Sequence, residues 1–170
     1  MDGARKTLIA RSADTWGAEE MRAALGVLES GQYTIGKKTQ EFEEAYAAYC
    51  GTKYCVAVNS GSSANLLMVA AWTLRYGAGL VVVPAVGWST SYSPFQQYGW
   101  QLVFVDIDRD TLNYHIAGLN HAATTYAPDV ILAINLLGNP NQFHSFPAGI
   151  PILEDNCESM GASYAGKTTG

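Results

Sequence analysis

The chain has 170 residues, of which 48% are hydrophobic and only 15% charged, and its formal net charge is −5. The length favours one domain over two, and the apolar composition predicts extensive buried surface in a core and in an oligomer interface. The acidic balance excludes nucleic acid as a partner, and no run of about 18 apolar residues exists to span a membrane. The three cysteines form no CxxC pair, which predicts a cytoplasmic protein without a disulfide framework or metal site.

Two helices are predicted before residue 52. Apolar residues recur at helical spacing over residues 15–31, with Thr15 as the expected N-cap and Gly31 as the stop. The pattern repeats over residues 39–51, where aromatic side chains share one face and Gly51 ends the helix.

From residue 54 onward, predicted strands alternate with predicted helices. Residues 54–61 form a short β-branched run that ends in Asn-Ser-Gly, and a helix is expected to begin immediately after it. Further strands are expected at residues 80–87, 101–108, 129–138 and 150–155, and a helix opened by serine and threonine at residues 89–99. This alternation predicts an α/β fold, a three-layer α/β/α sandwich around a mainly parallel sheet.

The stretch "NSGSSAN" joins a strand to a helix through Gly61, Ser62 and Ser63. Unpaired backbone N–H groups and hydroxyls at a helix N-terminus attract an anion, because the donors and the positive end of the helix dipole point the same way. A phosphate would fit there. The alternative, an ordinary serine N-cap, is about equally well supported by these residues.

Two strands end in side chains that can meet a ligand at one edge of the sheet. Trp88 follows the strand at 80–87 and could stack on a flat ring, although a core tryptophan is the commoner arrangement. Asp155 closes the strand at 150–155, where a carboxylate could hold a cationic ring nitrogen; its alternative role is to cap a short helix. Glu158 could contact the same ligand or sit in the first turn of that helix.

The three histidines, His115, His121 and His144, are expected in polar connecting segments. They lack metal-ligand spacing, so no metal site is predicted. Histidines in such segments are usually solvated or structural, and we assign these three no role.

A phosphate cup, a stacking aromatic and an acid for a ring nitrogen follow one another along the chain, and together they describe a pyridoxal phosphate site. Here the chain resembles the DegT-type family of pyridoxal-phosphate nucleotide-sugar aminotransferases and 3-dehydratases, in the fold type I aminotransferase superfamily. The resemblance runs through "SGQYTIGKKTQEFEEAYAAYCGTKYCVAVNSGSSANLL", "VVVPAVGWSTSYSPFQQYG", "VFVDIDRDTLNY", "NLLGNPN" and "LEDNCESMGASYAGKTTG". It implies that residues 1–170 are the N-terminal part and most of the cofactor-binding large domain, with the C-terminal small domain absent.

The resemblance also implies roles for individual residues. Ser62 and Ser63, with Gly61, would bind the phosphate of pyridoxal 5'-phosphate or pyridoxamine 5'-phosphate. Trp88 would stack on the pyridine ring, and Asp155 would pair with the ring nitrogen. That pairing keeps the ring protonated, so that it can withdraw electrons from a bound substrate.

Glu158 departs from the family's aminotransferases, which commonly carry glutamine near the ring hydroxyl. The family's sugar 3-dehydratases resemble this chain in having an acid at this position, and they replace the Schiff-base lysine with histidine. In the family that lysine or histidine lies beyond the position of Gly170, so we expect no catalytic residue within these residues. The family usually has a helix between "LGNPN" and "ILED", whereas residues 142–151 are short and contain two prolines.

The leading functional hypothesis is an aminotransferase that acts on a nucleotide-linked keto-deoxy sugar with glutamate as amino donor, for amino-sugar or surface-polysaccharide biosynthesis. The alternative is a sugar 3-dehydratase that uses pyridoxal or pyridoxamine phosphate with histidine as base. A second alternative is a truncated, non-catalytic cofactor-binding domain. The family's active sites lie at a homodimer interface, so we expect a homodimer, and Tyr33 in "GQYTIG" is a candidate for contacting the sugar.

Overall fold

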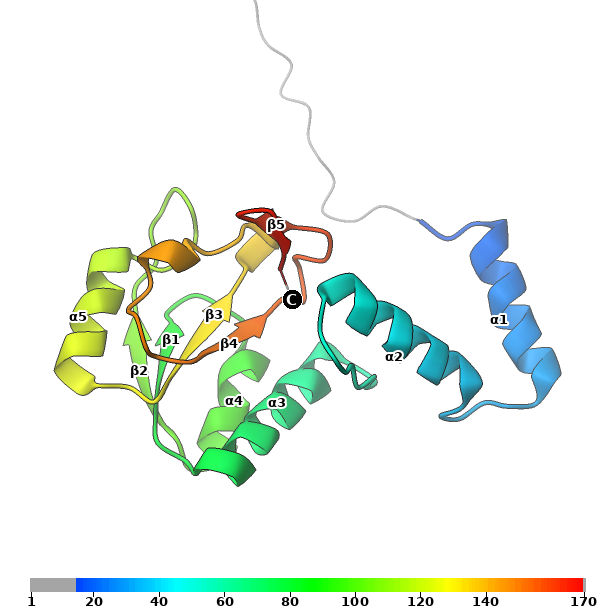
Figure 1. The fold of residues 1–170 in the computed structure, drawn as a ribbon, viewed down its shortest axis with the longest axis horizontal. Coiled ribbons are helices and arrows are strands. Elements are labelled where there is room, and N and C mark those ends of the chain that lie inside the picture. Colours follow the sequence, from blue (N-terminus) through cyan, green and yellow to red (C-terminus); the bar gives the residue numbers. More distant parts are fainter. Residues whose placement is uncertain (1–14, 170) are drawn as a thin grey trace, which may run out of the picture. The chain divides into compact units, whose positions relative to one another are not determined.

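The computed structural model describes residues 15–169 (Figure 1). These residues belong to two compact units, one that ends at Glu41 and one that starts at Phe42. Whether both belong to one domain spanning residues 1–170 stays a prediction.

The first unit contains helix α1 (Ala18–Ser30). Its N-cap is Gly17, whose backbone N–H donates to the Glu20 carboxylate at 2.7 Å. The prediction of a Thr15 cap was therefore wrong, because Glu20 reaches back and supplies the acceptor at this end of the helix. Gly31 ends α1 as predicted, with φ of 71°, a left-handed conformation that glycine adopts without a steric penalty.

Helix α2 (Lys37–Cys50) begins in the first unit and continues into the second. Its aromatic side chains form a ladder along the second part of the helix: the ring centroids of Phe42 and Tyr46 are 5.6 Å apart, and those of Tyr46 and Tyr49 are 6.0 Å apart. The predicted stop at Gly51 is confirmed by its φ of 69°.

A four-stranded sheet forms the centre of the second unit. Its strands lie in the order β2-β1-β3-β4, and every pairing is parallel. In the register of β3 with β4, Ile134 pairs with Asp155, so the carboxyl ends of these two strands lie side by side. The strands are β1 (Leu80–Pro84), β2 (Gln101–Val105), β3 (Val130–Ile134) and β4 (Ile152–Asp155).

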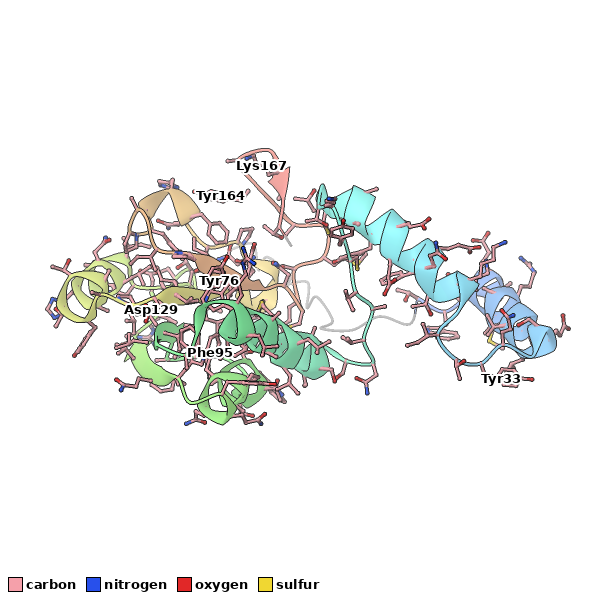
Figure 2. The ribbon with its side chains drawn as sticks, turned by 60° about the horizontal axis from the view of Figure 1, so that its bottom comes forward. Tyr33, Tyr76, Phe95, Asp129, Tyr164 and Lys167 are labelled. Atoms are coloured by element: carbon pink, nitrogen blue, oxygen red, sulfur yellow. The ribbon has the colours of Figure 1, made fainter. Side chains whose placement is uncertain are left out.

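Helices cover both faces of this sheet (Figure 1). Alternate residues of β1 face opposite sides: Val81 and Val83 belong to one hydrophobic core, and Val82 belongs to the other. The first core includes residues of α3 and α4, among them Phe95, labelled in Figure 2, and the second includes residues of α5. The predicted three-layer α/β/α architecture is confirmed. These helices are α3 (Gly61–Tyr76), α4 (Ser89–Gln97) and α5 (Ile116–Tyr126).

Residues 54–59 do not form the strand that the sequence predicted. The segment is extended, but among the described residues no other strand pairs with it. Its apolar side chains at Val56 and Val58 are exposed, and the backbone N–H of Ala57 donates to the carboxylate of Glu43 at 2.8 Å. A β-branched sequence favours extended backbone, yet a strand also requires a neighbour for its hydrogen bonds.

Helix α5 was missed, and it holds two of the three histidines. His115 is its N-cap, with Nδ1 accepting from the backbone N–H of Gly118 at 3.2 Å, and His121 lies within the helix. The segment is poor in strong helix formers, so its stability comes from packing: Leu119 and Ala122, three residues apart, are both buried. The expectation of polar connecting segments was wrong for this stretch.

Short elements complete the second unit after β3. Two 3-10 turns, η1 (Leu136–Gly138) and η2 (Phe143–Ser145), are followed by an antiparallel hairpin of β5 (Ser163–Tyr164) and β6 (Lys167–Thr168), which presents the exposed Lys167 labelled in Figure 2. As the short, proline-containing sequence indicated, residues 142–151 contain no α-helix. Across residues 15–169, no helix has both the length and the apolar character needed to cross a membrane.

Candidate functional site

The N-terminus of α3 combines a capped turn with unpaired donors. Ser60 is the N-cap: its hydroxyl accepts from the backbone N–H of Ser63 at 3.2 Å. The Ser63 hydroxyl is itself engaged, donating to Asn59 at 2.7 Å. The backbone N–H groups of Gly61 and Ser62 have no acceptor among the described residues. A serine cap is therefore compatible with anion binding at this turn, because the cap satisfies only part of the helix end.

Asp155 is a buried carboxylate at the end of β4, with 6% of its surface exposed. Its Oδ2 accepts from the Ser91 hydroxyl at 2.7 Å and from the Asn65 amide at 2.8 Å. Its Oδ1 accepts from the backbone N–H of Cys157 at 3.2 Å, which closes a turn and not the short helix considered from the sequence. Burial alone would raise the pKa of Asp155, but the hydrogen bonds, that of Ser91 foremost, outweigh it and hold the pKa below its ordinary value.

The charge of Asp155 has no cationic partner in the part of the chain that the structure describes. Neutral donors alone stabilise the carboxylate, and its charge raises the pKa of two neighbours. Burial first and Asp155 second raise the pKa of Cys157 to about 11 and that of Tyr92 to about 12. The Cys157 thiol is therefore neutral near pH 7 and is no nucleophile.

A cavity of about 610 Å³ brings most of the predicted site residues together. Residues from four separate stretches line it, and those predicted from the sequence are Gly61, Ser62, Trp88, Asp155 and Glu158. Ser63 lies instead in a smaller cavity that shares Ser62 with the first. The carboxyl ends of parallel strands and the N-terminus of a helix thus meet at one site, as expected for an open α/β sheet.

Trp88 lies on the wall of this cavity with 74% of its surface exposed. A core tryptophan is therefore excluded, and the indole face is accessible to a ligand. Trp88 also begins α4 as its N-cap residue. The residue before it, Gly87, packs tightly: a Cβ there would lie 2.7 Å from Cδ1 of Ile134, so only glycine fits without a shift of the neighbours.

Glu158 reaches the cavity from the loop after β4, and its Oε2 accepts from the backbone N–H of Leu137 at 2.7 Å. Leu137 has φ of 53°, an uncommon conformation for a residue with a side chain. This hydrogen bond fixes the orientation of the Glu158 carboxylate relative to the end of β3.

Tyr33 belongs to the first unit and is 70% exposed, with its hydroxyl donating to the Leu28 carbonyl at 3.1 Å. Its contact with a sugar stays a prediction.

Sequence reasoning missed Asn65 and Ser91, the two donors to Asp155. Asn65 is only 7% exposed within α3, and Ser91 is 2% exposed within α4. A buried polar side chain in a helix requires a partner, so the amide and the hydroxyl could have been flagged once the apolar faces of these helices were assigned. The sequence gives no signal that both donors converge on the same carboxylate oxygen.

Residues 14–170 match the model of the DegT/DnrJ/EryC1/StrS aminotransferase family. The chain belongs to this family. The predicted resemblance is thereby confirmed, and with it the α/β fold of the pyridoxal-phosphate-dependent enzymes that act on nucleotide sugars.

Two 3-dehydratases are among the most similar relatives. GDP-4-keto-6-deoxy-D-mannose 3-dehydratase from Yersinia pseudotuberculosis is 46% identical over 94% of this chain and 43% of its own length. The E. coli GDP-4-keto-6-deoxy-D-mannose-3-dehydratase, solved with hydrated pyridoxal phosphate, is 44% identical with a TM-score of 0.88, over 94% of this chain and 43% of its own. The chain thus spans less than half the length of these relatives.

Aminotransferases of the family are less similar. A protein from Streptococcus pneumoniae, assigned as a sugar aminotransferase and solved in its PMP form, is 28% identical with a TM-score of 0.78 over 89% of this chain and 43% of its own. The aminotransferase prediction therefore holds at the level of the family, and the 3-dehydratase alternative agrees better with the more similar relatives.

The cofactor expected from the sequence, pyridoxal or pyridoxamine phosphate, is the one held by these solved structures. The cavity fits that group on its own chemistry. A buried carboxylate without a cationic partner suits a protonated ring nitrogen, unpaired N–H groups suit a phosphate, and an exposed indole suits the ring face.

Proposed function

We propose that this chain forms the cofactor-binding part of a pyridoxamine-phosphate-dependent 3-dehydratase that acts on a GDP-linked 4-keto-6-deoxy sugar. The observation that carries the choice is the difference in identity: 46% and 44% to 3-dehydratases, against 28% to the sugar aminotransferase. Glu158 supports the same choice, since an acid stands where the family's aminotransferases commonly have glutamine.

In this proposal the residues of the cavity hold the cofactor at three points. The backbone N–H groups of Gly61 and Ser62 bind the phosphate. Ser63, in the same first turn of α3, assists them. Trp88 covers one face of the ring. Asp155 would accept a hydrogen bond from the ring nitrogen, and Oδ1 has more room for it, since Oδ1 holds one hydrogen bond, from the Cys157 N–H, and Oδ2 holds two.

When bound, pyridoxamine phosphate supplies an electron sink that stabilises negative charge on the carbon next to its amine. The contribution of Asp155 is to remain ionised and keep the ring nitrogen protonated, which its lowered pKa and its neutral partners permit. Glu158, held by the Leu137 N–H, would present a carboxylate with a fixed orientation to the cavity.

The base that moves the substrate proton is proposed to be a histidine beyond Gly170, in place of the lysine that an aminotransferase requires. The proposal also includes glutamate as the source of the amine, assembly as a homodimer, and contact of Tyr33 with the sugar. A nucleotide-linked keto sugar as substrate agrees with the names of the relatives.

Product analysis distinguishes the proposal from its rivals. The full-length protein would be incubated with pyridoxamine phosphate, glutamate and GDP-4-keto-6-deoxy-D-mannose, and the nucleotide sugar would be examined by NMR and mass spectrometry. Loss of the C3 hydroxyl without a new amine supports the dehydratase. An amine in place of the ketone would refute it in favour of the aminotransferase, and bound cofactor without any turnover would favour the non-catalytic alternative.

A further inference from the structure

A cluster of buried polar side chains lies where β3 and β4 end, next to the cavity but outside its lining. Asn135 and Asn141 are each 1% exposed, and Ser159 is 2% exposed. Buried amides are costly unless they are hydrogen-bonded, and an apolar residue could have filled the same space. The cluster consists of the buried Asn135, Asn141 and Ser159 together with the half-buried Glu154 and Asn156.

Asn135 is the centre of this cluster, and it contacts both neighbours of Asp155. Its Nδ2 donates to Oε1 of Glu154 and to Oδ1 of Asn156, each at 2.6 Å. Its backbone N–H donates to the carbonyl of Asp155 itself at 3.2 Å. Three consecutive residues of the strand end are therefore tied to one asparagine.

The amide oxygen of Asn135 is fixed from the other side. It accepts from the backbone N–H of Asn141 at 2.9 Å and from the Asn141 side chain at 3.0 Å. The Asn141 side chain also donates to the carbonyl of Ile134 at 2.9 Å. Because both ends of the amide are engaged, Asn135 can hold only one orientation.

The same cluster continues to the loop that carries Glu158. Oδ1 of Asn156 accepts from the Ser159 hydroxyl at 2.5 Å, and the Ser159 backbone N–H donates to the carbonyl of Asn156 at 3.0 Å. Glu158 lies between these two residues in sequence. Its carboxylate accepts from Leu137, two positions after Asn135, so both acids of the cavity depend on the short segment that follows β3.

We propose that Asn135 is a positioning residue, which holds the end of β4 so that the carboxylate of Asp155 meets Ser91 and Asn65 and its free lone pairs face the cavity. The hydrogen bonds of Asp155 to α3 and α4 are short, 2.8 and 2.7 Å respectively, and a small shift of the strand end would lengthen both. The contact of Asp155 with a bound cofactor is the part of this inference that rests on the proposed function.

The test follows Asp155 directly and does not need a cofactor. The pKa of its carboxyl would be measured by the carbon-13 shift of the side chain during an acid titration, in the full-length protein and in the Asn135→Ala variant. We expect the pKa to rise in the variant, because the carboxylate stays buried while its donors are displaced. The matched control is Asn139→Ala in the same loop, which loses a hydrogen bond of 2.6 Å to the Thr111 carbonyl but contacts neither acid.

A second variant keeps the test usable if Asn135→Ala does not fold. Asn141→Ala removes the side-chain amide that donates to the Asn135 oxygen and to the Ile134 carbonyl. It leaves the backbone N–H donor of residue 141 and the contacts to Glu154 and Asn156 in place, so it should raise the pKa of Asp155 in the same direction by less. The dissociation constant of pyridoxamine phosphate is measured in parallel, and in Asn135→Ala it should increase about tenfold, the effect of removing an outer partner of a ligand-binding residue.

The outcomes separate the two proposals. A raised Asp155 pKa in Asn135→Ala or Asn141→Ala, with Asn139→Ala unchanged, supports the positioning role even if the wild-type protein fails to bind the cofactor, which would refute only the proposed function. An Asp155 pKa that is the same in all variants would overturn the positioning role, whether or not the cofactor binds.

Discussion

Replacing Ser91 with alanine tests the electrostatic account of Asp155. Ser91 is 2% exposed, and its hydroxyl donates to the buried Asp155 carboxylate at 2.7 Å. A hydrogen bond to a charged group contributes about 1.5–3 kcal/mol, so Ser91→Ala should lower the free energy of unfolding by about that amount near pH 7.

The cost of the substitution should depend on pH, and the sign follows from the pKa. The folded-state pKa of Asp155 is lowered, so the stability that its ionised form contributes is present above the ordinary value of 3.8 and is lost as the pH falls through the folded-state value. Below that pH the carboxyl is protonated in both states, and the Ser91 hydroxyl then contributes only about 0.5–1.5 kcal/mol, as between neutral groups.

Urea unfolding followed by tryptophan fluorescence at a series of pH values between neutral and acidic would measure this. The control is Ser93→Ala on the same helix, which removes a hydroxyl bonded to the Ser89 carbonyl on the exposed surface; its effect should stay within about 0.5 kcal/mol at every pH. A Ser91→Ala cost that equals the control, or that does not shrink as the pH falls, would refute the reasoning.

Substitutions at three further positions distinguish effects on cofactor binding from effects on stability. Trp88→Ala should weaken pyridoxamine phosphate binding by roughly tenfold, about 1.4 kcal/mol, and a calorimetric titration showing unchanged affinity would contradict this. Because the indole is exposed, the same substitution should change the free energy of unfolding by less than about 0.5 kcal/mol. Glu158→Gln keeps an acceptor for the Leu137 N–H, whereas Glu158→Ala does not. Only the alanine variant should therefore lose about 0.5–1.5 kcal/mol of the free energy of unfolding measured in urea, and equal stabilities of the two variants would argue against the hydrogen bond. Tyr114→Phe removes the hydroxyl that lies 3.1 Å from the Val82 carbonyl and 2.7 Å from the Leu132 carbonyl in the core. It should lower the free energy of unfolding by about 1–3 kcal/mol, and a loss below about 0.5 kcal/mol would show that this bridge is not needed.

The sheet and its edge could be predicted because their signals are local. Each of the four strands contains a short apolar run, and the side chains that follow these runs, Trp88 after β1 and Asp155 at the end of β4, reach one edge through parallel topology alone. The resemblance to a family then indicated what such an edge would bind.

What the sequence did not reveal depends on contacts between distant segments. The segment 54–59 has a strand sequence but no strand beside it within residues 15–169, and α5 has a weak helix sequence that packing makes stable. The partners of Asp155, Asn65 and Ser91, lie 90 and 64 positions away in the chain. No local pattern encodes the convergence of an amide and a hydroxyl on one carboxylate oxygen.

The most direct test of the central claim is an absorbance spectrum of the full-length protein with pyridoxal phosphate, before and after reduction with borohydride. The 3-dehydratase account predicts that the cofactor binds in the cavity bordered by Trp88 and Asp155 and that borohydride does not fix it to the protein, because no lysine holds it. Cofactor that becomes covalently attached to the chain after reduction would contradict this account and identify an aminotransferase.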